Sequence, residues 1–282
     1  MSEPAAGAAW MSRRTDRVHL TYHQDDRPVA DLVLNAFTTA YPRLTADIGF
    51  SPPDTIRIII AGTNQEFQTL TQGAVPDWGA GCAIPDENLI VLKSSRIPGL
   101  DADVREVVVH ELSHIVLNQA LNGADVPRWL DEGFAMHESR EWQVWQRLSL
   151  TLAVLSHSLI PLRDIRHVNT FSERKAQLAY LESSLAVRFI LARYGRQGLQ
   201  QLIQGFATAG TTDGAFMDGL GTGMDEFEAA WLEDLTRQYG WRALSGEVFS
   251  FWVIATLLFL LAYWSKRRQA RLIVQRWERE EE

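Results

Sequence analysis

His110-Glu111-Leu112-Ser113-His114 spells H-E-x-x-H, and this pentapeptide decides how the chain is interpreted. On an α-helix, residues four positions apart lie on the same face, so the two imidazoles can point at one metal ion with Glu111 beside them as a general base. The flanking sequence favours a helix, because its apolar residues cover a wide surface. These residues are Val104, Val107, Val108, Leu112, Ile115, Val116 and Leu121.

The apolar surroundings of this motif strengthen the prediction of a metal site. A histidine on an apolar helix face is by default a packed, hydrogen-bonded core residue. Here two histidines and a glutamate share one hydrophobic helix, and burying three ionisable groups without a partner costs free energy. Zinc suits this set of side chains, because it binds imidazole nitrogen and carboxylate oxygen. Zn²⁺ is therefore the expected cofactor.

A third zinc ligand must come from elsewhere in the chain, since catalytic zinc usually takes three protein ligands and leaves one position for water. The metzincin spacing H-E-x-x-H-x-x-G-x-x-H fails, because Leu117 stands at the glycine position and Ala120 at the third histidine. A short loop downstream, a second helix is expected to pack antiparallel to the first. Asp131 and Glu132 on that helix both reach the histidines, and the residues alone leave the choice open.

The two helices together carry a family resemblance. H-E-L-S-H followed by the stretch from Pro127 to Ala135, P-R-W-L-D-E-G-F-A, resembles the peptidase MA-like metalloproteases of the gluzincin group. The resemblance implies that His110, His114 and Glu132 bind the metal and that Glu111 is the catalytic base. It also implies a peptide or protein substrate, hydrolysed by a water that zinc activates.

Three further expectations follow from the same resemblance. A strand around Gly81–Ile84 lies beside the cleft, where an extended substrate pairs with it. Tyr180, on a later helix, is the candidate donor to the oxyanion. Thermolysin-like gluzincins also carry a supporting acid one turn after the glutamate ligand, but Met136 occupies that position here. Asp131 and Glu138 are the two candidates to replace it.

The order of the expected elements predicts an α+β fold. Residues 1–14, rich in small residues, are expected to be disordered. Residues 15–98 form a small sheet subdomain of strands and helices, and residues 99–240 a mainly helical zincin subdomain. Within the latter, the pattern is interrupted near Pro161 and over the Gly- and Thr-rich stretch 205–223.

The C-terminal segment differs in kind from the rest of the chain. Residues 247–264 are expected to form a transmembrane helix, since Val248 to Trp264 is nearly free of polar residues and spans about 26 Å as a helix. Lys266-Arg267-Arg268 begins a charged tail, 265–282, which the positive-inside rule places in the cytoplasm. The catalytic domain is then extracytoplasmic at the cell membrane. No export signal precedes it, which leaves three alternatives: a start codon upstream, a signal removed from this sequence, or a cytosolic domain on a tail anchor. The charge asymmetry across the span favours a missing signal.

Composition narrows the function further. The net charge of −8 argues against a nucleic-acid partner, which needs a basic surface, and the single cysteine, Cys82, excludes an internal disulfide and a cysteine-based zinc site. The sequence thus predicts a membrane-anchored zinc metallopeptidase, and the lack of a motif for a free peptide amine favours an endopeptidase. The alternatives are a catalytically silent binding module of the same fold and a zinc hydrolase acting on a non-peptide bond.

Overall fold

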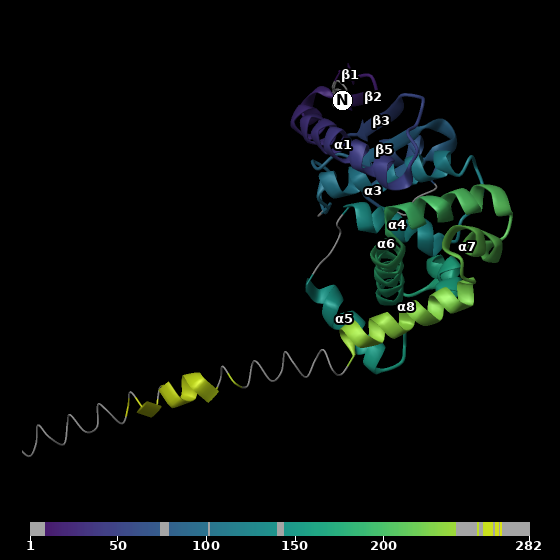
Figure 1. Cartoon of the computed structure of the whole chain (residues 1–282). Helices are drawn as coiled ribbons and strands as arrows, with labels where there is room; N and C mark the ends of the chain where they lie inside the picture. Colours follow the sequence, from purple (N-terminus) through teal and green to yellow (C-terminus); the bar gives the residue numbers. More distant parts are fainter. Residues whose placement is uncertain are drawn as a thin grey trace, which may run out of the picture. The chain divides into compact units, whose positions relative to one another are not determined.

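The structure is a computed structural model of the whole chain (Figure 1). It describes residues 9–73, 79–100, 102–139 and 144–240 and, near the C-terminus, residues 253, 256–261, 263, 264 and 266. Met1–Leu150 and Leu159–Trp231 together form one compact unit, and Thr151–Ser158 with Leu232–Glu282 form a second. The first unit holds the sheet and every residue of the site described below.

The sheet has five strands in the order β1-β2-β3-β5-β4. The strands are β1 (Trp10–Arg14), β2 (Val18–His23), β3 (Ile56–Ala61), β4 (Gly81–Ile84) and β5 (Leu89–Lys93). The central strands β2, β3 and β5 run parallel, and the two outer strands are antiparallel to their neighbours. Strand β4 therefore forms one edge of the sheet among the described residues.

Eight helices and three 3-10 turns are the other elements whose bounds the structure gives among the described residues. The helices are α1 (Arg27–Ile48), α2 (Asn64–Leu70), α3 (Val104–Ala120), α4 (Arg128–Ser139), α5 (Val144–Leu155), α6 (Glu173–Ala209), α7 (Thr212–Leu220) and α8 (Met224–Tyr239). The 3-10 turns are η1 (Gln24–Asp26), η2 (Pro85–Glu87) and η3 (Leu162–Thr170). Helix α6 is kinked at Gly195, whose φ of 69° is left-handed.

The two faces of the sheet are covered by different helices. Apolar residues dominate β3 and β5, as is typical of strands that are buried on both faces. On one face, Phe67 of α2 packs against Cys82 and Val91. Because side chains alternate along a strand, Ile58 and Ile90 point to the opposite face, where α1 and α3 pack together against the sheet. Helix α3 thus lies between the sheet and α4 (Figure 1).

The expected α+β architecture is confirmed, with a small N-terminal sheet followed by a mostly helical part. Two local expectations differ from the structure. Trp10–Arg14 form β1 although residues 1–14 were expected to be disordered, because pairing with β2 supplies hydrogen bonds that composition does not reveal. The stretch 205–223 contains α7, whose end at Gly221 adopts the left-handed conformation that glycine readily allows.

Half of the predicted transmembrane segment falls on residues that the structure leaves undescribed. Residues 247–252, 254, 255 and 262 lie outside the described residues, as do residues 1–8 and 267–282 at the two ends of the chain. Among the residues that are described, no helix has both the length and the apolar character needed to cross a bilayer.

Candidate metal centre

Helix α3, which contains the H-E-x-x-H motif, is capped at its N-terminus and packed in the core. Asp103 caps its N-terminus by accepting a hydrogen bond from the Arg105 backbone N–H at 2.9 Å. Val108, Leu112 and Ile115 are fully buried and hold one side of the helix in the core. His110 and His114 extend from another side, one turn apart, and their ring centroids lie 4.9 Å from one another.

A tight turn brings α4 back against α3. Asn122 and Gly123 both have positive φ, a conformation in which Gly and Asn commonly end a helix, and α3 ends there. Helix α4 then packs against both α3 and α6. Its Gly133 lies so close to α6 that an added Cβ would be 2.4 Å from the Ser183 carbonyl oxygen. This contact requires glycine next to Glu132 and sets the position of α4, from which Glu132 faces α3.

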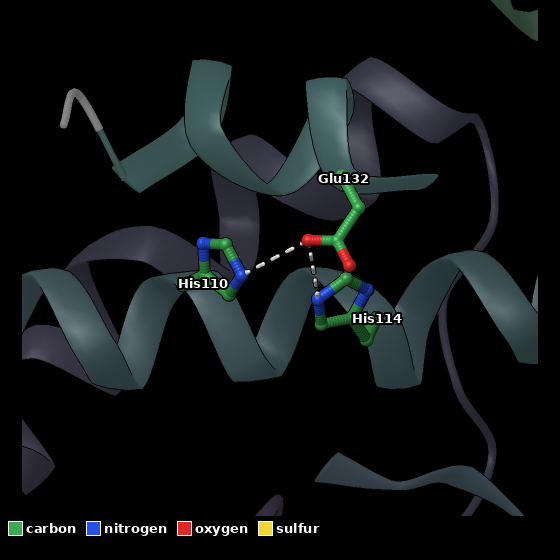
Figure 2. A group of neighbouring side chains, drawn as sticks. All are labelled: His110, His114 and Glu132. Atoms are coloured by element: carbon green, nitrogen blue, oxygen red, sulfur yellow. Dashed lines mark ion pairs between the residues drawn. The ribbon is translucent and has the colours of Figure 1, made fainter. Parts of the chain in front are cut away.

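His110, His114 and Glu132 converge on one point (Figure 2). The Nε2 atoms of the two histidines lie 3.6 and 3.9 Å from Oε2 of Glu132, and the three ligand atoms all lie within 4.8 Å of one another. Zinc–ligand bonds of about 2.0–2.2 Å place the corners of a tetrahedron about 3.4 Å apart. The two distances from Glu132 therefore fit zinc after a contraction of a few tenths of an ångström, and no other such group occurs among the described residues.

Asp131 supports one of the histidines and does not join this cluster. Its Oδ1 lies 2.7 Å from Nδ1 of His114, so the imidazole donates Nδ1–H to Asp131 and turns Nε2 toward Glu132. Glu138, the other candidate supporting acid, forms an ion pair with Arg43 of α1 at 2.5 Å. The structure thus assigns to Asp131 the orienting contact that Met136 cannot make.

The charges of the site are strongly coupled. Burial would raise the pKa of Glu132, but the hydrogen bond to His110 and the charges of His114 and Arg128 lower it to about 2. Burial would lower the pKa of His114, but Asp131 and the two glutamates raise it to about 10. The pKa of His110 is raised in the same way. Metal binding needs neutral imidazoles, so a cation entering this site competes with protons.

Glu111 lies between α3 and the sheet edge. The backbone N–H of Ala83 in β4 donates to its carboxylate, while burial outweighs this bond and the nearby histidines and raises the pKa of Glu111. The same surroundings act on Cys82, whose pKa burial and the charge of Glu111 raise to about 11. That thiol stays protonated at neutral pH, in keeping with a packing role.

Two residues at the site were not recognised as a pair in the sequence. Nη2 of Arg128 lies 3.2 Å from Oε1 of Glu132. The two histidines contact the other carboxylate oxygen, Oε2. Arg128 also bonds Tyr180 of α6, and burial with the charge of Glu132 raises the pKa of that phenol. The i, i+4 spacing of Arg128 and Glu132 is the one sequence signal that predicts the ion pair. Nothing local predicts that Tyr180 joins them.

Comparison with known families agrees with this geometry. The model of a family described as the Peptidase MA superfamily matches residues 36–237, which include all of the site residues named above. A search of curated proteins gave no match. The resemblance inferred from the two motifs is therefore confirmed at the level of the superfamily.

Proposed function

The chain belongs to the Peptidase MA superfamily, and from this premise we propose that it is a zinc-dependent metallopeptidase of the gluzincin type. The superfamily itself supports a peptidase-type enzyme. The observation that carries the finer proposal is the convergence of His110, His114 and Glu132 with Glu111 one residue away on α3. These groups match the residue types and spacing that zinc-dependent hydrolysis of a peptide bond requires.

In this proposal His110, His114 and Glu132 hold the metal. Bound zinc supplies Lewis acidity, which polarises the substrate carbonyl and makes a water molecule easier to deprotonate. Glu111 accepts a proton from the attacking water and passes it to the leaving amine. Its raised pKa suits the first step, because a carboxylate of higher pKa is a stronger base toward water than that of an exposed glutamate.

Tyr180 is the proposed donor to the oxyanion that develops on the substrate carbonyl. Its hydroxyl is held by Arg128 beside Glu132, at the metal centre, and its raised pKa keeps the phenol protonated. A protonated hydroxyl donates a hydrogen bond, and a donor of this kind is worth a few kcal/mol in the transition state. Arg128 then has two tasks, since it also pairs with the ligand Glu132.

A peptide substrate is proposed to lie along β4. The Lys93 N–H donates to the Ala80 carbonyl, so these two residues form a hydrogen-bonded pair of the antiparallel ladder. Pairs alternate along such a ladder, and Gly81 and Ala83 consequently direct their backbone groups away from β5. An extended peptide can add to this edge by pairing with the backbone of Gly81 and the carbonyl of Ala83, next to Glu111, which already accepts the Ala83 N–H. Binding through internal backbone groups favours an endopeptidase.

A membrane anchor at residues 247–264 remains a separate proposal. It is supported by large apolar side chains that are at least half exposed among the described residues, namely Leu257, Leu258, Phe259, Leu260, Leu261 and Trp264. The cationic residues from Lys266 onward favour a cytoplasmic tail and an extracytoplasmic catalytic domain. Alkaline extraction of membranes from cells that produce the full chain tests the anchor. Retention in the pellet supports it, and release into the supernatant contradicts it.

The peptidase proposal is tested with the purified full-length chain and unstructured casein. Cleavage that a zinc chelator abolishes and added zinc restores is the expected result, together with about one zinc per chain as zinc-dependent catalysis requires. One zinc per chain without cleavage of casein would instead favour the catalytically silent binding module or hydrolysis of a non-peptide bond. Absence of tightly bound metal would contradict the proposal.

A further inference from the structure

We propose that Gly81 in β4 is a positioning residue for Glu111. The missing side chain at Gly81 leaves the space that the glutamate occupies, and the N–H of Ala83, two residues along the same strand, holds its carboxylate. This inference rests on the proposed function, because it concerns the placement of the general base. It adds that the sheet edge, and not α3 alone, determines where the base points.

The first observation is steric. A Cβ on Gly81 would lie 2.6 Å from Cγ1 of Val107, 2.8 Å from Cγ of Glu111 and 2.9 Å from Glu111 Oε1. All three distances are shorter than real Cβ contacts. The φ angle of Gly81 is not positive, so its backbone conformation does not require glycine. Glycine is required at position 81 because β4 packs closely on the turn of α3 that contains Glu111.

The second observation is a hydrogen bond. Ala83 lies on the same side of β4 as Gly81, because side chains in a strand alternate. Its N–H faces away from β5 by the ladder pattern, and this N–H donates to the carboxylate of Glu111. The carboxylate is therefore confined on one side by the bare Cα of Gly81 and held on another by a backbone donor. A glutamate otherwise has several rotamers to choose from.

These two contacts predict which group yields when a methyl is added. Val107 is β-branched and has one strongly preferred rotamer in a helix, so its 2.6 Å contact with the added methyl has to be relieved by a shift of β4 away from α3. The end of the Glu111 side chain can rotate away from its own two contacts. Both movements break the bond between Glu111 and Ala83. None of the three atoms nearest to the added methyl belongs to His110, His114 or Glu132, so we expect the metal ligands to keep their places.

The test compares Gly81→Ala with Gly223→Ala, a glycine without positive φ whose added Cβ meets no atom within 4 Å. A general base contributes about 10²–10⁴-fold, so a displaced base should lower kcat by about 10- to 100-fold. The zinc content of Gly81→Ala should stay within about twofold of wild type, since the three proposed ligands are other residues. Gly223→Ala should match wild type throughout.

A second variant isolates the hydrogen bond. Ala83→Pro removes the N–H that Glu111 accepts, and proline is tolerated on an edge strand whose N–H faces outward. It should lower kcat in the same way as Gly81→Ala. In the Glu111→Gln background, Gly81→Ala should cause no further loss of kcat, because the base is already gone.

Hydrogen exchange in metal-free protein gives a readout that does not depend on activity. Exchange of the Ala83 amide should be faster in Gly81→Ala than in wild type, while the melting temperature shows whether the variant is folded. Wild-type kcat in a folded Gly81→Ala variant, or unchanged Ala83 exchange, would overturn the inference and leave the peptidase proposal standing. Failure of wild-type protein to cleave casein would instead remove the proposed function itself.

Discussion

Glu132 and Glu182 are both buried glutamates of the helical part, but their partners differ. Glu132 on α4 faces two imidazoles and Arg128, which lower its pKa to about 2. Among the described residues, no cation contributes to the pKa shift of Glu182 on α6. Its Oε2 accepts the Ile160 N–H at 3.0 Å, and burial with repulsion from Glu228 raises its pKa to about 8.

The difference shows what a buried carboxyl needs in order to serve as a metal ligand. The negative charge of ionised Glu132 is balanced by Arg128 and by the protonated imidazoles of His110 and His114. A metal ion bound to Glu132 can therefore replace the protons of the two imidazoles. Glu182 is protonated at neutral pH and acts as a neutral anchor. Together with Glu228, whose Oε1 accepts the Leu162 N–H at 2.6 Å, it fastens the segment before η3 to the helices. Burial alone therefore does not distinguish the two roles.

The largest effect is expected for Glu132→Ala. The variant leaves two histidines without their third partner, so zinc content should fall sharply and cleavage of casein should fall to background. Elemental analysis of protein dialysed against metal-free buffer measures the first and a casein assay the second. Asp125→Ala, which removes an exposed acid just before α4, is the control. Full zinc occupancy in Glu132→Ala would show that the third ligand lies elsewhere.

Glu111→Gln separates the base from the ligands. The amide keeps the size of the side chain but cannot take a proton, so kcat should fall by about 10²–10⁴-fold while zinc content is unchanged. Steady-state kinetics on a quenched peptide, paired with metal analysis of the same sample, provides the measurement. Activity equal to that of wild type would refute the role of Glu111 as the base.

Asp131→Ala should have an intermediate effect. It removes the carboxylate that orients His114 without removing a ligand, and loss of such a contact typically lowers metal affinity about 10- to 100-fold. Competition with a chromogenic zinc chelator measures the affinity. Asp131→Asn, which keeps an oxygen acceptor for Nδ1–H, should recover part of the loss. If Asp131→Ala lost zinc as completely as Glu132→Ala, the assignment of ligand and supporting acid would be reversed.

The smallest effect on zinc content and cleavage is expected at Glu182, which lies outside the proposed metal site. Its titration affects the pH dependence of the free energy of unfolding. The folded state holds this proton up to about pH 8, whereas an unfolded glutamate releases it near its ordinary pKa of 4.5. The folded state thus binds more protons in this window, and the free energy of unfolding decreases as pH rises through it.

Glu182→Gln removes this titration and keeps an oxygen for the Ile160 N–H. Relative to wild type, the variant should gain roughly 3–4 kcal/mol of unfolding free energy between pH 5 and pH 8.5, because the pKa of Glu182 differs between about 8 in the folded state and 4.5 in the unfolded state. Urea denaturation at the two pH values measures the gain, and Asp164→Asn, an exposed acid of η3, should show none. A pH-independent difference between Glu182→Gln and wild type would contradict the assignment.

The sequence predicted the parts of the site that depend on local spacing. Four-residue spacing places His110 and His114 on one helix face, and the Asn122-Gly123 turn predicts that the next helix returns beside it. Asp131 and Glu132 are adjacent on that helix, and both are within reach of the histidines. Their roles depend on the rotation of α4, which is set by the close contact of Gly133 with α6.

Contacts between residues distant in the sequence were beyond prediction. Glu138 meets Arg43 across 95 residues, which removed it as a supporting acid, and the Ala83 N–H meets Glu111 only because β4 and α3 pack together. The edge pairing of β1 was missed for the same reason. Each of these depends on tertiary packing, which composition and periodicity do not encode.

Helix α3 is shared between the sheet and the helical part, since it touches β4 and β5 on one side and α4 on the other. Local unfolding of either the sheet or the helical part should therefore disturb His110 and His114 on α3. Metal occupancy and global unfolding should therefore be thermodynamically linked, and each tenfold rise in free zinc above its dissociation constant should add about 1.4 kcal/mol to the resistance of the whole unit to unfolding. Susceptibility of the N-terminal strands to trypsin would then report on the loading of a centre to which they contribute no ligand.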